Sequence, residues 1–331
     1  MNIAIVGATG NVGRKTLEVL ERKKLPIKNL FLVASSKSVG KKLKFNGQSL
    51  EIEDINSFDF SKSQITFFAA GGKISEEYAE EASKHTIVID NSSFFRMDPE
   101  VPLVVPQVNG EAIKKMKKNI IANPNCSTAQ LVIILKPLHD LFKIKRLVIS
   151  TYQSTSGAGK APMDELLQQT KLSLENKKIV SKNFTKQIAF NAIPHIDTFV
   201  EEGYTKEELK IVNETKKILD KSIEITATCV RIPVLVSHAE SVNIEFENEF
   251  TVEKICKALN NAEGCKVIDE RKDGGYITPL EAEGKNETFI SRIRKDNSNN
   301  KAVNLWCVSD NLLRGAALNA VEIAEAYIKN N

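Results

Sequence analysis

The chain has 331 residues, of which 42% are hydrophobic and 27% charged, and its 46 Lys and Arg against 42 Asp and Glu leave a formal net charge of +4. This is the composition of a globular protein. It argues against a nucleic-acid partner, and no apolar run approaches the roughly 18 residues of a membrane helix. One hydrophobic core rarely grows past roughly 250–300 residues, so we expect two domains. The five cysteines form no Cys-x-x-Cys pair, so neither disulfides nor a metal site are expected. The N-terminus lacks the basic flank of a secretion signal, and we expect a reducing cytoplasm.

Strand and helix patterns alternate over the first 140 residues. Apolar runs predict strands at 3–6, 30–34, 65–70, 86–90 and 119–122, and helical spacing predicts helices at 11–22, 74–84 and 127–141. Asn46 and Gly47 predict a hairpin turn because both residues tolerate positive φ. Strands that alternate with helices indicate a parallel sheet with right-handed crossovers, so we expect an α/β domain at residues 1–126.

The second half has a different order of elements. Strands are expected at 145–153, 223–236, 242–250 and 302–308, and helices at 163–174, 206–220 and 311–328. Val242, Ile244 and Phe246 alternate with polar residues, which is typical of an antiparallel sheet with one polar face. We therefore expect an α+β domain with a large mixed sheet at residues 127–310. The final helix (311–329) should pack back on the first domain, and a two-fold partner should cover the apolar face of the second sheet.

A glycine-rich turn lies between the first strand and the first helix. Its residues are Gly7, Ala8, Thr9, Gly10, Asn11, Val12 and Gly13. The pattern G-x-x-G-x-x-G is a variant of the dinucleotide-binding fingerprint, in which glycines let the backbone approach a pyrophosphate and the helix start offers free N–H groups. A tight turn without a ligand is the plain alternative. The strand before and the helix after favour a Rossmann-like dinucleotide domain.

The residues after the second strand bear on which dinucleotide binds. An NAD site places an acidic residue about 20 residues after the glycine motif. No Asp or Glu occurs between Arg22 and Leu50, whereas Lys37 and Ser38 follow the second strand directly. A 2′-phosphate attracts an ammonium and a hydroxyl, so NADP(H) is the expected cofactor. The lysines further along are explained equally well as a solvated basic hairpin.

Cys126 lies where a short strand meets an apolar helix. Pro124 precedes it and polar residues surround it, so the cysteine lies at or next to a helix N-terminus. The helix dipole and free N–H groups there favour a nucleophilic thiolate and could hold an oxyanion. Local features leave this interpretation and that of an inert buried thiol equally open. The other cysteines (Cys229, Cys256, Cys265 and Cys307) lie in strand or helix patterns and are expected to be inert.

A reactive thiol needs a base, and the chain has four histidines. His85 and His139 lie at helix ends, where solvated or capping roles suffice. His195 and His238 both remain candidates for the base from the residues alone.

Taken together, the motifs resemble the aspartate-β-semialdehyde dehydrogenase family over nearly the whole chain. They lie at residues 7–13, 35–41, 91–96, 104–109, 123–128, 151–153, 156–159, 194–197, 214–217, 229–234, 237–241 and 309–312. The resemblance implies NADPH-dependent reduction of L-4-aspartyl phosphate to L-aspartate 4-semialdehyde in lysine, threonine and methionine biosynthesis. It also implies a homodimer.

The resemblance further implies a role for each matching residue. Cys126 would be the nucleophile that forms an acyl thioester, His238 the acid–base group and Gln153 the group that orients the acyl portion. Arg231 would hold the substrate carboxylate and Glu214 the amino group. The phosphate would be bound by Arg96, Lys217 and Asn125. NADP(H) would be bound by Gly7, Thr9, Gly10, Asn11, Val12, Gly13, Lys37, Ser38, Ser156, Gly157, Ala158 and Asn311.

Three rival functions share parts of this pattern. An N-acetyl-γ-glutamyl-phosphate reductase has a similar plan. The amine of its substrate is blocked, however, so a carboxylate such as Glu214 would be of little use there. Glyceraldehyde-phosphate dehydrogenase is disfavoured because no acidic residue follows the second strand. A catalytically silent NADP-binding protein would not need Cys126, His238, Gln153 and Arg231 together.

Overall fold

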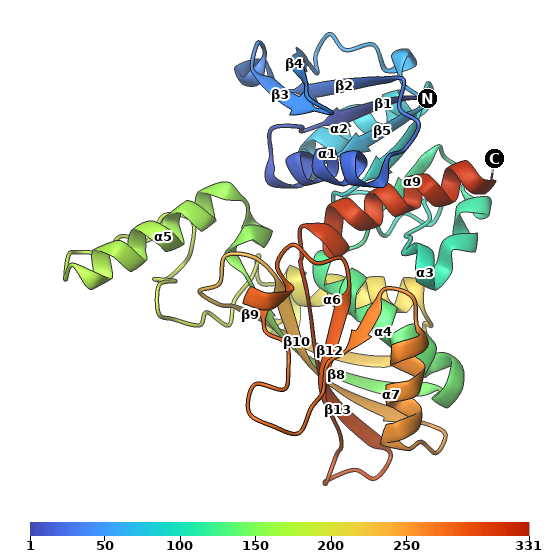
Figure 1. Ribbon diagram of the computed structural model, residues 1–331, viewed down its shortest axis with the longest axis vertical. Coiled ribbons are helices and arrows are strands. Elements are labelled where there is room, and N and C mark those ends of the chain that lie inside the picture. Colours follow the sequence, from blue (N-terminus) through green and yellow to red (C-terminus); the bar gives the residue numbers. More distant parts are fainter. Residues whose placement is uncertain (331) are drawn as a thin grey trace. The chain divides into compact units, whose positions relative to one another are not determined.

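The computed structural model describes residues 1–330, with the backbone alone for Asn330. The chain forms two compact units (Figure 1). The first contains residues 1–125 and the segment from Ala316 onward, and the second contains residues 126–315.

The first unit is built on a seven-stranded sheet with the order β3-β4-β2-β1-β5-β6-β7. The strands are β1 (Asn2–Val6), β2 (Asn29–Ala34), β3 (Lys42–Phe45), β4 (Gln48–Asp54), β5 (Ile65–Phe68), β6 (Ile87–Asp90) and β7 (Ile120–Ala122). All neighbours pair in parallel except the hairpin β3–β4. Asn46 and Gly47 turn this hairpin with φ of 47° and 78°, which confirms the predicted turn.

The helices of the first unit are α1 (Asn11–Lys23), α2 (Gly72–Ser83), α3 (Pro106–Asn109) and α9 (Leu318–Asn330). α1 buries Thr16, Leu17 and Leu20 on one side, as its helical spacing predicts. α9 comes from the end of the chain and packs against α1, α3 and β6. A parallel sheet wrapped by helices confirms the Rossmann-like domain.

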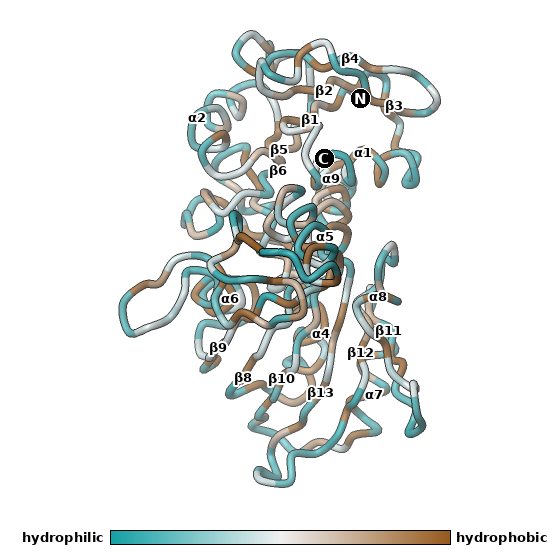
Figure 2. The backbone as a smooth tube through the Cα atoms, turned by 90° about the vertical axis from the view of Figure 1, so that its left-hand side faces the viewer, coloured by the Kyte–Doolittle hydropathy of each residue, from teal (hydrophilic) through white to brown (hydrophobic). Residues whose placement is uncertain are grey.

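The second unit holds a six-stranded mixed sheet with the order β11-β12-β13-β10-β8-β9. Its strands are β8 (Ile144–Gln153), β9 (Glu224–Arg231), β10 (His238–Phe246), β11 (Cys265–Val267), β12 (Thr288–Lys295) and β13 (Ala302–Ser309). Its helices are α4 (Cys126–Phe142), α5 (Lys160–Leu174), α6 (Lys206–Ile218), α7 (Val252–Asn261) and α8 (Pro279–Ala282). In Figure 2 the brown, apolar stretches follow the strands, and the loops at the outer ends are mostly teal.

Helices of the same chain cover the apolar face of this sheet. Val242, Ile244 and Phe246 of β10 are fully buried, and α4 packs against β8, β10 and β13, while α7 packs against β12. The expectation that a partner subunit covers this face is therefore wrong. Ser241 is exposed, and Asn243 and Glu245 are half-buried on the opposite face. The alternation predicted the two faces correctly but could not say which elements supply the cover.

Several elements differ from their expected bounds. β9 ends at Arg231, five residues early, because Pro233 cannot donate to a sheet. The expected last helix begins with a π-helical turn (Leu313–Ala317) before α9. α7, β11 and β12 were not predicted, because charged residues interrupt their apolar pattern.

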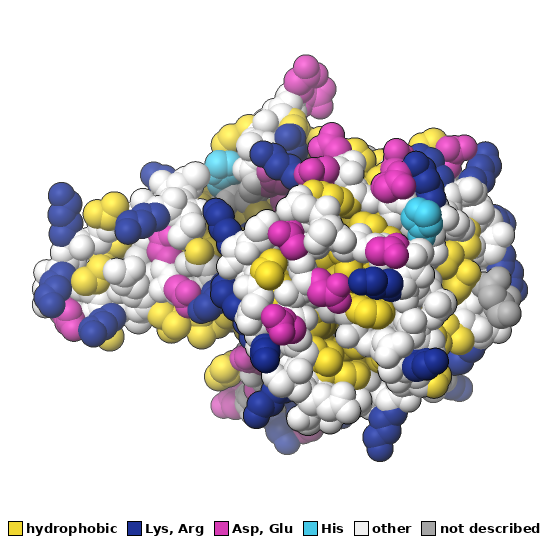
Figure 3. All heavy atoms as spheres, turned by 90° about the horizontal axis from the view of Figure 1, so that it is seen from above, with side chains coloured by type: hydrophobic (Ala, Val, Ile, Leu, Met, Phe, Trp, Pro, Cys, Tyr) yellow, Lys and Arg dark blue, Asp and Glu magenta, His cyan; other side chains and the backbone are white. Residues whose placement is uncertain are grey.

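α5 and the chain after it project from the sheet of the second unit as an arm (Figure 1). Five large apolar side chains in this arm are exposed: Leu167, Leu174, Val180, Phe190 and Phe199. Seen from above, the projecting part carries apolar and basic side chains together (Figure 3).

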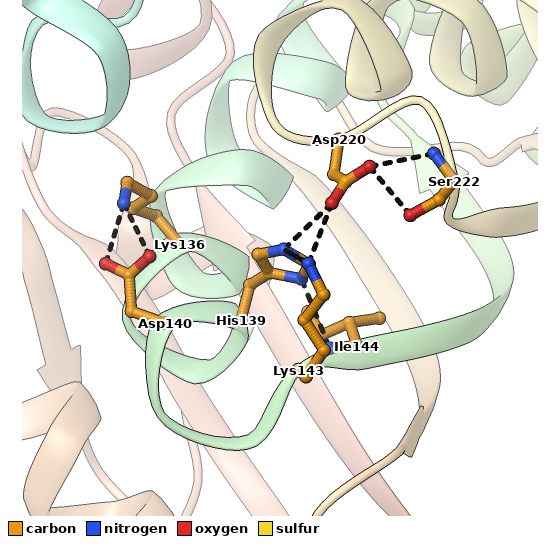
Figure 4. A network of polar contacts seen from close by, with 7 residues as sticks. All are labelled: Lys136, His139, Asp140, Lys143, Ile144, Asp220 and Ser222. Atoms are coloured by element: carbon orange, nitrogen blue, oxygen red, sulfur yellow. Dashed lines mark hydrogen bonds and ion pairs between the residues drawn. The ribbon is translucent and has the colours of Figure 1, made fainter.

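A polar network anchors the C-terminal end of α4 (Figure 4). His139 Nδ1 accepts a hydrogen bond of 3.1 Å from the amide of Ile144, and its Nε2 lies 3.4 Å from Asp220 Oδ2. Lys143 Nζ donates to the same oxygen at 2.9 Å. Hydrogen bonds from Ser222, followed by Lys143, lower the pKa of Asp220 far below its usual range. His139 thus ties the end of α4 to the first residue of β8 and to Asp220.

Within the described residues, no helix is both long and apolar enough to cross a membrane.

Candidate active site

The turn after β1 leaves no room for side chains at two of its glycines. A Cβ at Gly7, where φ is 83°, would lie 2.6 Å from the carbonyl oxygen of Ala69. A Cβ at Gly13 would lie 2.3 Å from the carbonyl oxygen of Gly7. Gly10 is the N-cap of α1 and offers no side-chain cap to the first-turn N–H groups. These N–H groups can bind an anion, so the turn fits the pyrophosphate of a dinucleotide.

The segment after β2 holds Lys37 and Ser38 in a short 3-10 turn (Ser36–Ser38). Lys37 is exposed and Ser38 is buried. A carboxylate that the sequence analysis missed lies beside Ser36, because Asp54 ends β4 opposite Ala34 of β2. Hydrogen bonds from Ser36 and Asn56 lower the pKa of Asp54. The position of Asp54 beside Ser36 cannot be predicted from the spacing in the sequence, since it depends on the parallel pairing of β4 with β2.

Arg96 is buried in the first unit and anchored by its backbone neighbours. Its Nε donates to the carbonyl oxygen of Asn123 at 2.9 Å, and one terminal nitrogen donates to that of Asn91 at 2.9 Å. The guanidinium therefore lies against the short segment that leads from β7 to Asn125, which is also buried.

Cys126 is the first residue of α4 and is half-buried. Gly315 packs against it so closely that a Cβ at position 315 would lie 2.6 Å from Cys126 Cβ. The expected position at a helix N-terminus is therefore confirmed. The positive end of the helix dipole favours the thiolate of such a residue.

The sheet topology brings the other candidate side chains of the second unit to one edge. β8 and β9 are parallel and end together, with Gln153 paired to Arg231. β10 is antiparallel to β8 and begins at His238 on the same edge. Residues far apart in the sequence therefore converge because three neighbouring strands end or start there.

Arg231 is buried and tied to its neighbours by charge and hydrogen bonding. One terminal nitrogen donates to the carbonyl oxygen of Ser154 at 2.6 Å. Burial lowers the pKa of Arg231, against the opposing charges of Glu207, Cys126 and Cys229. Arg231 and Cys126 thus interact electrostatically, and the positive charge of the guanidinium favours a thiolate.

Gln153 is buried with both ends of its amide satisfied. Its Oε1 accepts from Thr151 Oγ1 at 3.0 Å, and its Nε2 donates to Glu207 Oε1 at 3.1 Å. Glu207 belongs to α6, is itself buried, and also accepts from Lys210 Nζ at 3.1 Å. Gln153 therefore links the end of β8 to the start of α6.

His238 is fully buried. Its Nδ1 lies 3.0 Å from both the amide nitrogen and the Oγ of Ser154. Burial, followed by the charge of Arg231, lowers the pKa of His238 to about 3. A Cβ at Gly157 would lie 2.9 Å from His238 Nε2 and 3.2 Å from Arg231 Nη1. Only glycine at position 157 leaves this space open beside the imidazole and the guanidinium.

Of the two histidines left open by the sequence, His238 lies with Arg231. His195 instead stacks on Phe199 with ring centroids 4.3 Å apart. Burial raises the pKa of Cys265 to about 12, and it also raises the pKa values of Cys229 and Cys307, which disfavours their thiolates.

The expected cofactor residues of the second unit form a hydrogen-bond network. Ser156, Gly157 and Ala158 lie in a 3-10 turn (Thr155–Ala158) after β8. Asn311 Oδ1 accepts from Ser156 Oγ at 3.1 Å and from the amide of Ser237 at 2.9 Å, and it lies 3.2 Å from Ser154 Oγ. Ser237, next to His238, has a φ of 76°, which costs a non-glycine residue backbone strain.

Glu214 and Lys217 lie two turns further along α6 than Glu207 and Lys210. Both pairs share the same spacing and the same helix face, since seven residues make nearly two turns of about 5.4 Å each. The carboxylate in contact with Gln153 is that of Glu207. Glu207 and Glu214 each precede a lysine by three residues, so the sequence alone holds no signal that separates them.

A Rossmann-like unit, joined to a unit that gathers a thiol, an arginine and a neutral imidazole, defines a two-domain dehydrogenase. Two family models match the chain: "Semialdehyde dehydrogenase, NAD binding domain" at residues 2–116 and "Semialdehyde dehydrogenase, dimerisation domain" at residues 135–314. A curated aspartate-semialdehyde dehydrogenase of Aquifex aeolicus is 50% identical and covers 99% of this chain and 98% of its own. The chain therefore belongs to the aspartate-semialdehyde dehydrogenase family, which confirms the resemblance.

Solved structures agree with this membership. Aspartate semialdehyde dehydrogenase II of Vibrio cholerae, solved in complex with ASA, has a TM-score of 0.97 and 45% identity, covering 99% of this chain and 98% of its own. The Candida albicans enzyme, solved with NADP, has a TM-score of 0.74 and 26% identity, covering 98% of this chain and 97% of its own.

Proposed function

We propose that the protein reduces L-4-aspartyl phosphate to L-aspartate 4-semialdehyde with NADPH, through a thioester on Cys126. The observation that carries the proposal is that buried Gln153, Arg231 and His238 lie together where β8, β9 and β10 end or start, in a member of this family. The charge of Arg231 also acts on half-buried Cys126. A catalytically silent nucleotide-binding protein has no use for a buried cation and a neutral imidazole beside a thiol at a helix start.

Cys126 begins the reaction as a thiolate, favoured by the start of α4 and by Arg231. Its sulfur bonds to the β-carbonyl carbon of the acyl phosphate, and the carbonyl electron pair moves onto oxygen. When that oxyanion collapses, the C–O bond to phosphate breaks and a thioester remains. Covalent catalysis thus splits one difficult reduction into two easier steps.

The bound nicotinamide supplies a hydride to the thioester carbon. A second oxyanion forms and collapses, the C–S bond breaks, and aldehyde and thiolate are released. One proton is consumed overall, and it leaves on the phosphate. The cluster therefore has to stabilise negative charge on the same oxygen twice, and His238 is the group proposed to share a proton with it.

The cofactor assignments, and those of Arg96 and Asn125 to the phosphate, remain those implied by the family motifs. The proposed cofactor residues are Gly7, Thr9, Gly10, Asn11, Val12, Gly13, Lys37 and Ser38 of the first unit and Ser156, Gly157, Ala158 and Asn311 of the second. The preference for NADPH is supported by exposed Lys37 and by the engagement of Asp54 with Ser36 and Asn56. Arg96 and Asn125 of the first unit are proposed for the phosphate.

We propose Glu207 and Lys210 for the roles that the resemblance gave to Glu214 and Lys217. Glu207 is hydrogen-bonded to Gln153, and its charge acts on both Arg231 and His238. Burial alone would lower the pKa of Lys210, but Glu207 and Asp197 outweigh it and raise the pKa. A carboxylate and an ammonium beside the site suit the substrate amino group and an anion respectively.

A homodimer is proposed on the exposed apolar side chains of the arm, which lies inside the matched dimerisation domain. A second copy of the chain is the proposed cover. Light scattering should give a dimer for the wild type and a monomer for Leu174→Glu/Phe190→Glu. The control Leu280→Glu, at an exposed leucine outside the arm, should stay dimeric. A wild-type monomer would contradict the proposal.

The function is tested with the purified protein, aspartate semialdehyde, phosphate and NADP in the reverse direction. The expected result is absorbance growth at the NADPH band that requires all three reactants. Activity with N-acetyl-glutamate semialdehyde alone would favour the rival reductase, and no activity with either aldehyde would favour a silent protein. A reducing cytoplasm and a place in lysine, threonine and methionine biosynthesis are part of the proposal.

A further inference from the structure

Ser154 contacts the two charged or titratable groups at the end of the sheet with three different atoms. Its amide nitrogen and its Oγ each lie 3.0 Å from His238 Nδ1. Its carbonyl oxygen accepts from Arg231 Nη1 at 2.6 Å. The residue is completely buried, so these contacts are made without competing water. Ser154 lies between the motifs at 151–153 and 156–159 and belongs to neither.

The contact to the amide decides which nitrogen of His238 carries the proton. An amide N–H can only donate, so Nδ1 must offer its lone pair. A neutral imidazole has one proton, which then resides on Nε2. Nε2 is buried and has no hydrogen-bond partner among the described residues, and it faces the space that Gly157 leaves open. The Nε2–H of His238 is therefore a hydrogen-bond donor without a partner among the described residues, and it points into that space.

We propose that Ser154 is a positioning residue that holds His238 as the neutral Nε2–H tautomer, so that His238 acts as a hydrogen-bond donor to the reacting carbonyl oxygen. The inference deepens the proposed function and rests on it. In that reaction the carbonyl oxygen of the substrate becomes negative twice. It loses this charge each time when the oxyanion intermediate collapses. A fixed neutral donor stabilises both oxyanions without any net proton transfer at the ring.

The surroundings of His238 oppose the alternative, a charged imidazolium. A proton on Nδ1 would point at the amide N–H of Ser154. The groups that face the ring are Arg231 from β9, whose charge disfavours the imidazolium, and Glu207 from α6, whose charge favours it. Burial adds to the effect of Arg231, and together they keep the ring neutral.

The Oγ of Ser154 is itself held in place. It lies 3.0 Å from Ser156 Oγ and 3.2 Å from Asn311 Oδ1, and the latter also accepts from Ser156 and from the amide of Ser237. The Ser154 hydroxyl has one proton. Since Asn311 Oδ1 accepts from Ser156, we assign the Ser154 proton to Nδ1, whose lone pair is then shared between this hydroxyl and the amide. Since the carbonyl of Ser154 also receives Arg231, one residue sets the position of the proposed donor relative to the proposed carboxylate-binding group.

The proton positions can be measured directly by 15N and 1H NMR on the full-length protein labelled at its histidines. The chain has only four, and the resonances of His238 are identified as those lost in His238→Gln. From pH 5 to pH 9 we expect an unprotonated Nδ1 and a protonated Nε2. A proton on Nδ1, or a ring that charges near pH 6.5, would overturn the proposal.

Ser154→Ala keeps the backbone contacts and removes only the hydroxyl. Loss of a donor to Nδ1 favours protonation, so we expect the titration of His238 to move to higher pH. We also expect kcat to fall roughly three- to tenfold with little change in KM. Thr155→Val is the matched control, because the Thr155 hydroxyl is also buried but bonds the carbonyl of Val234. It should leave both the His238 spectrum and kcat unchanged.

An unchanged His238 titration and an unchanged kcat in Ser154→Ala would overturn the positioning role. Equal losses in Ser154→Ala and Thr155→Val would also overturn it, since they would indicate general disturbance. The spectra do not depend on turnover. A wild type that shows the expected tautomer but reduces no acyl phosphate would therefore contradict the proposed function and not the assignment of the proton.

Discussion

The two units offer different chemical groups for binding. The first offers a glycine turn, and the second offers a cluster of side chains. At the turn, backbone N–H groups offer the binding surface, and the side chains matter by being absent: at Gly7 and Gly13 a single Cβ would collide with the backbone. In the cluster, side chains from β8, β9, β10, α4 and α6 supply charge and hydrogen bonds from within a buried environment. The glycine turn depends on a short sequence segment, and the side-chain cluster depends on the whole topology of a sheet.

The strongest way to separate the two regions is to remove the nucleophile. Cys126→Ala should lower turnover by a factor of roughly a thousand or more, since nucleophile removal eliminates the covalent route. NADP(H) binding, measured by fluorescence titration, should persist. Near-normal rates in the variant would remove Cys126 from the mechanism.

The reverse experiment alters the turn alone. Gly13→Ala forces a Cβ to within 2.3 Å of the carbonyl oxygen of Gly7, so the turn must shift. We expect roughly a hundredfold weaker NADP(H) binding, of the order of a few kcal/mol of strain and lost contacts. Gly110→Ala is a control for glycine replacement, as no described atom lies within 4 Å of its added Cβ and its φ of −52° suits any residue. Equal effects in both variants would indicate unfolding.

A finer test lies along α6, where two acidic residues have the same spacing to a lysine. Glu207→Gln should raise KM for aspartate semialdehyde roughly tenfold, because a charged hydrogen bond contributes about 1.5–3 kcal/mol. Glu214→Gln should raise it less. If Glu214→Gln raises KM more, the roles return to Glu214 and Lys217.

The choice of cofactor can be shifted at Lys37. Lys37→Asp should lower the ratio of kcat/KM for NADPH over NADH by roughly tenfold, because a carboxylate repels the 2′-phosphate. The measurement is the two specificity constants at equal ionic strength. An unchanged ratio would exclude Lys37 from contact with that phosphate.

The last test measures stability and not activity, at Glu240, a fully buried residue on β10. Burial raises its pKa to about 8, against hydrogen bonds from Cys307 and Gln130. A raised folded pKa means that its contribution to stability is complete below about pH 4.5 and is lost as the pH rises through 8. The free energy of unfolding, measured with urea, should therefore fall less in Glu240→Gln than in the wild type between pH 5 and pH 9. A pKa shift of one unit corresponds to roughly 1.4 kcal/mol of this free energy. Parallel curves for both proteins would contradict this.

The sequence predicted best what depends on neighbouring residues. The glycine turn, the Asn46–Gly47 hairpin and the position of Cys126 at a helix start follow from local backbone chemistry, and the structure has all three. The alternation along β10 also gave its two faces. These signals need no knowledge of what lies across the sheet.

What the sequence missed depends on distant pairing. Asp54 reaches Ser36 only through the parallel pairing of β4 with β2. Glu207 and Glu214 cannot be told apart by spacing, because both belong to one face of one helix. Helices α4 and α7, rather than a partner, cover the apolar face of the second sheet, and only the tertiary fold decides which element supplies a cover.

The contact between Gly315 and Cys126 joins the start of α4 to a residue near the end of the chain. During synthesis, the thiol emerges from the ribosome long before the residue that will press against it. Until then α4 lacks one of the surfaces that fix its first turn, and the nascent chain carries a cysteine whose final surroundings are incomplete. A protein truncated before Gly315 should keep Cys126 and lose the contact that fixes the position of its thiol.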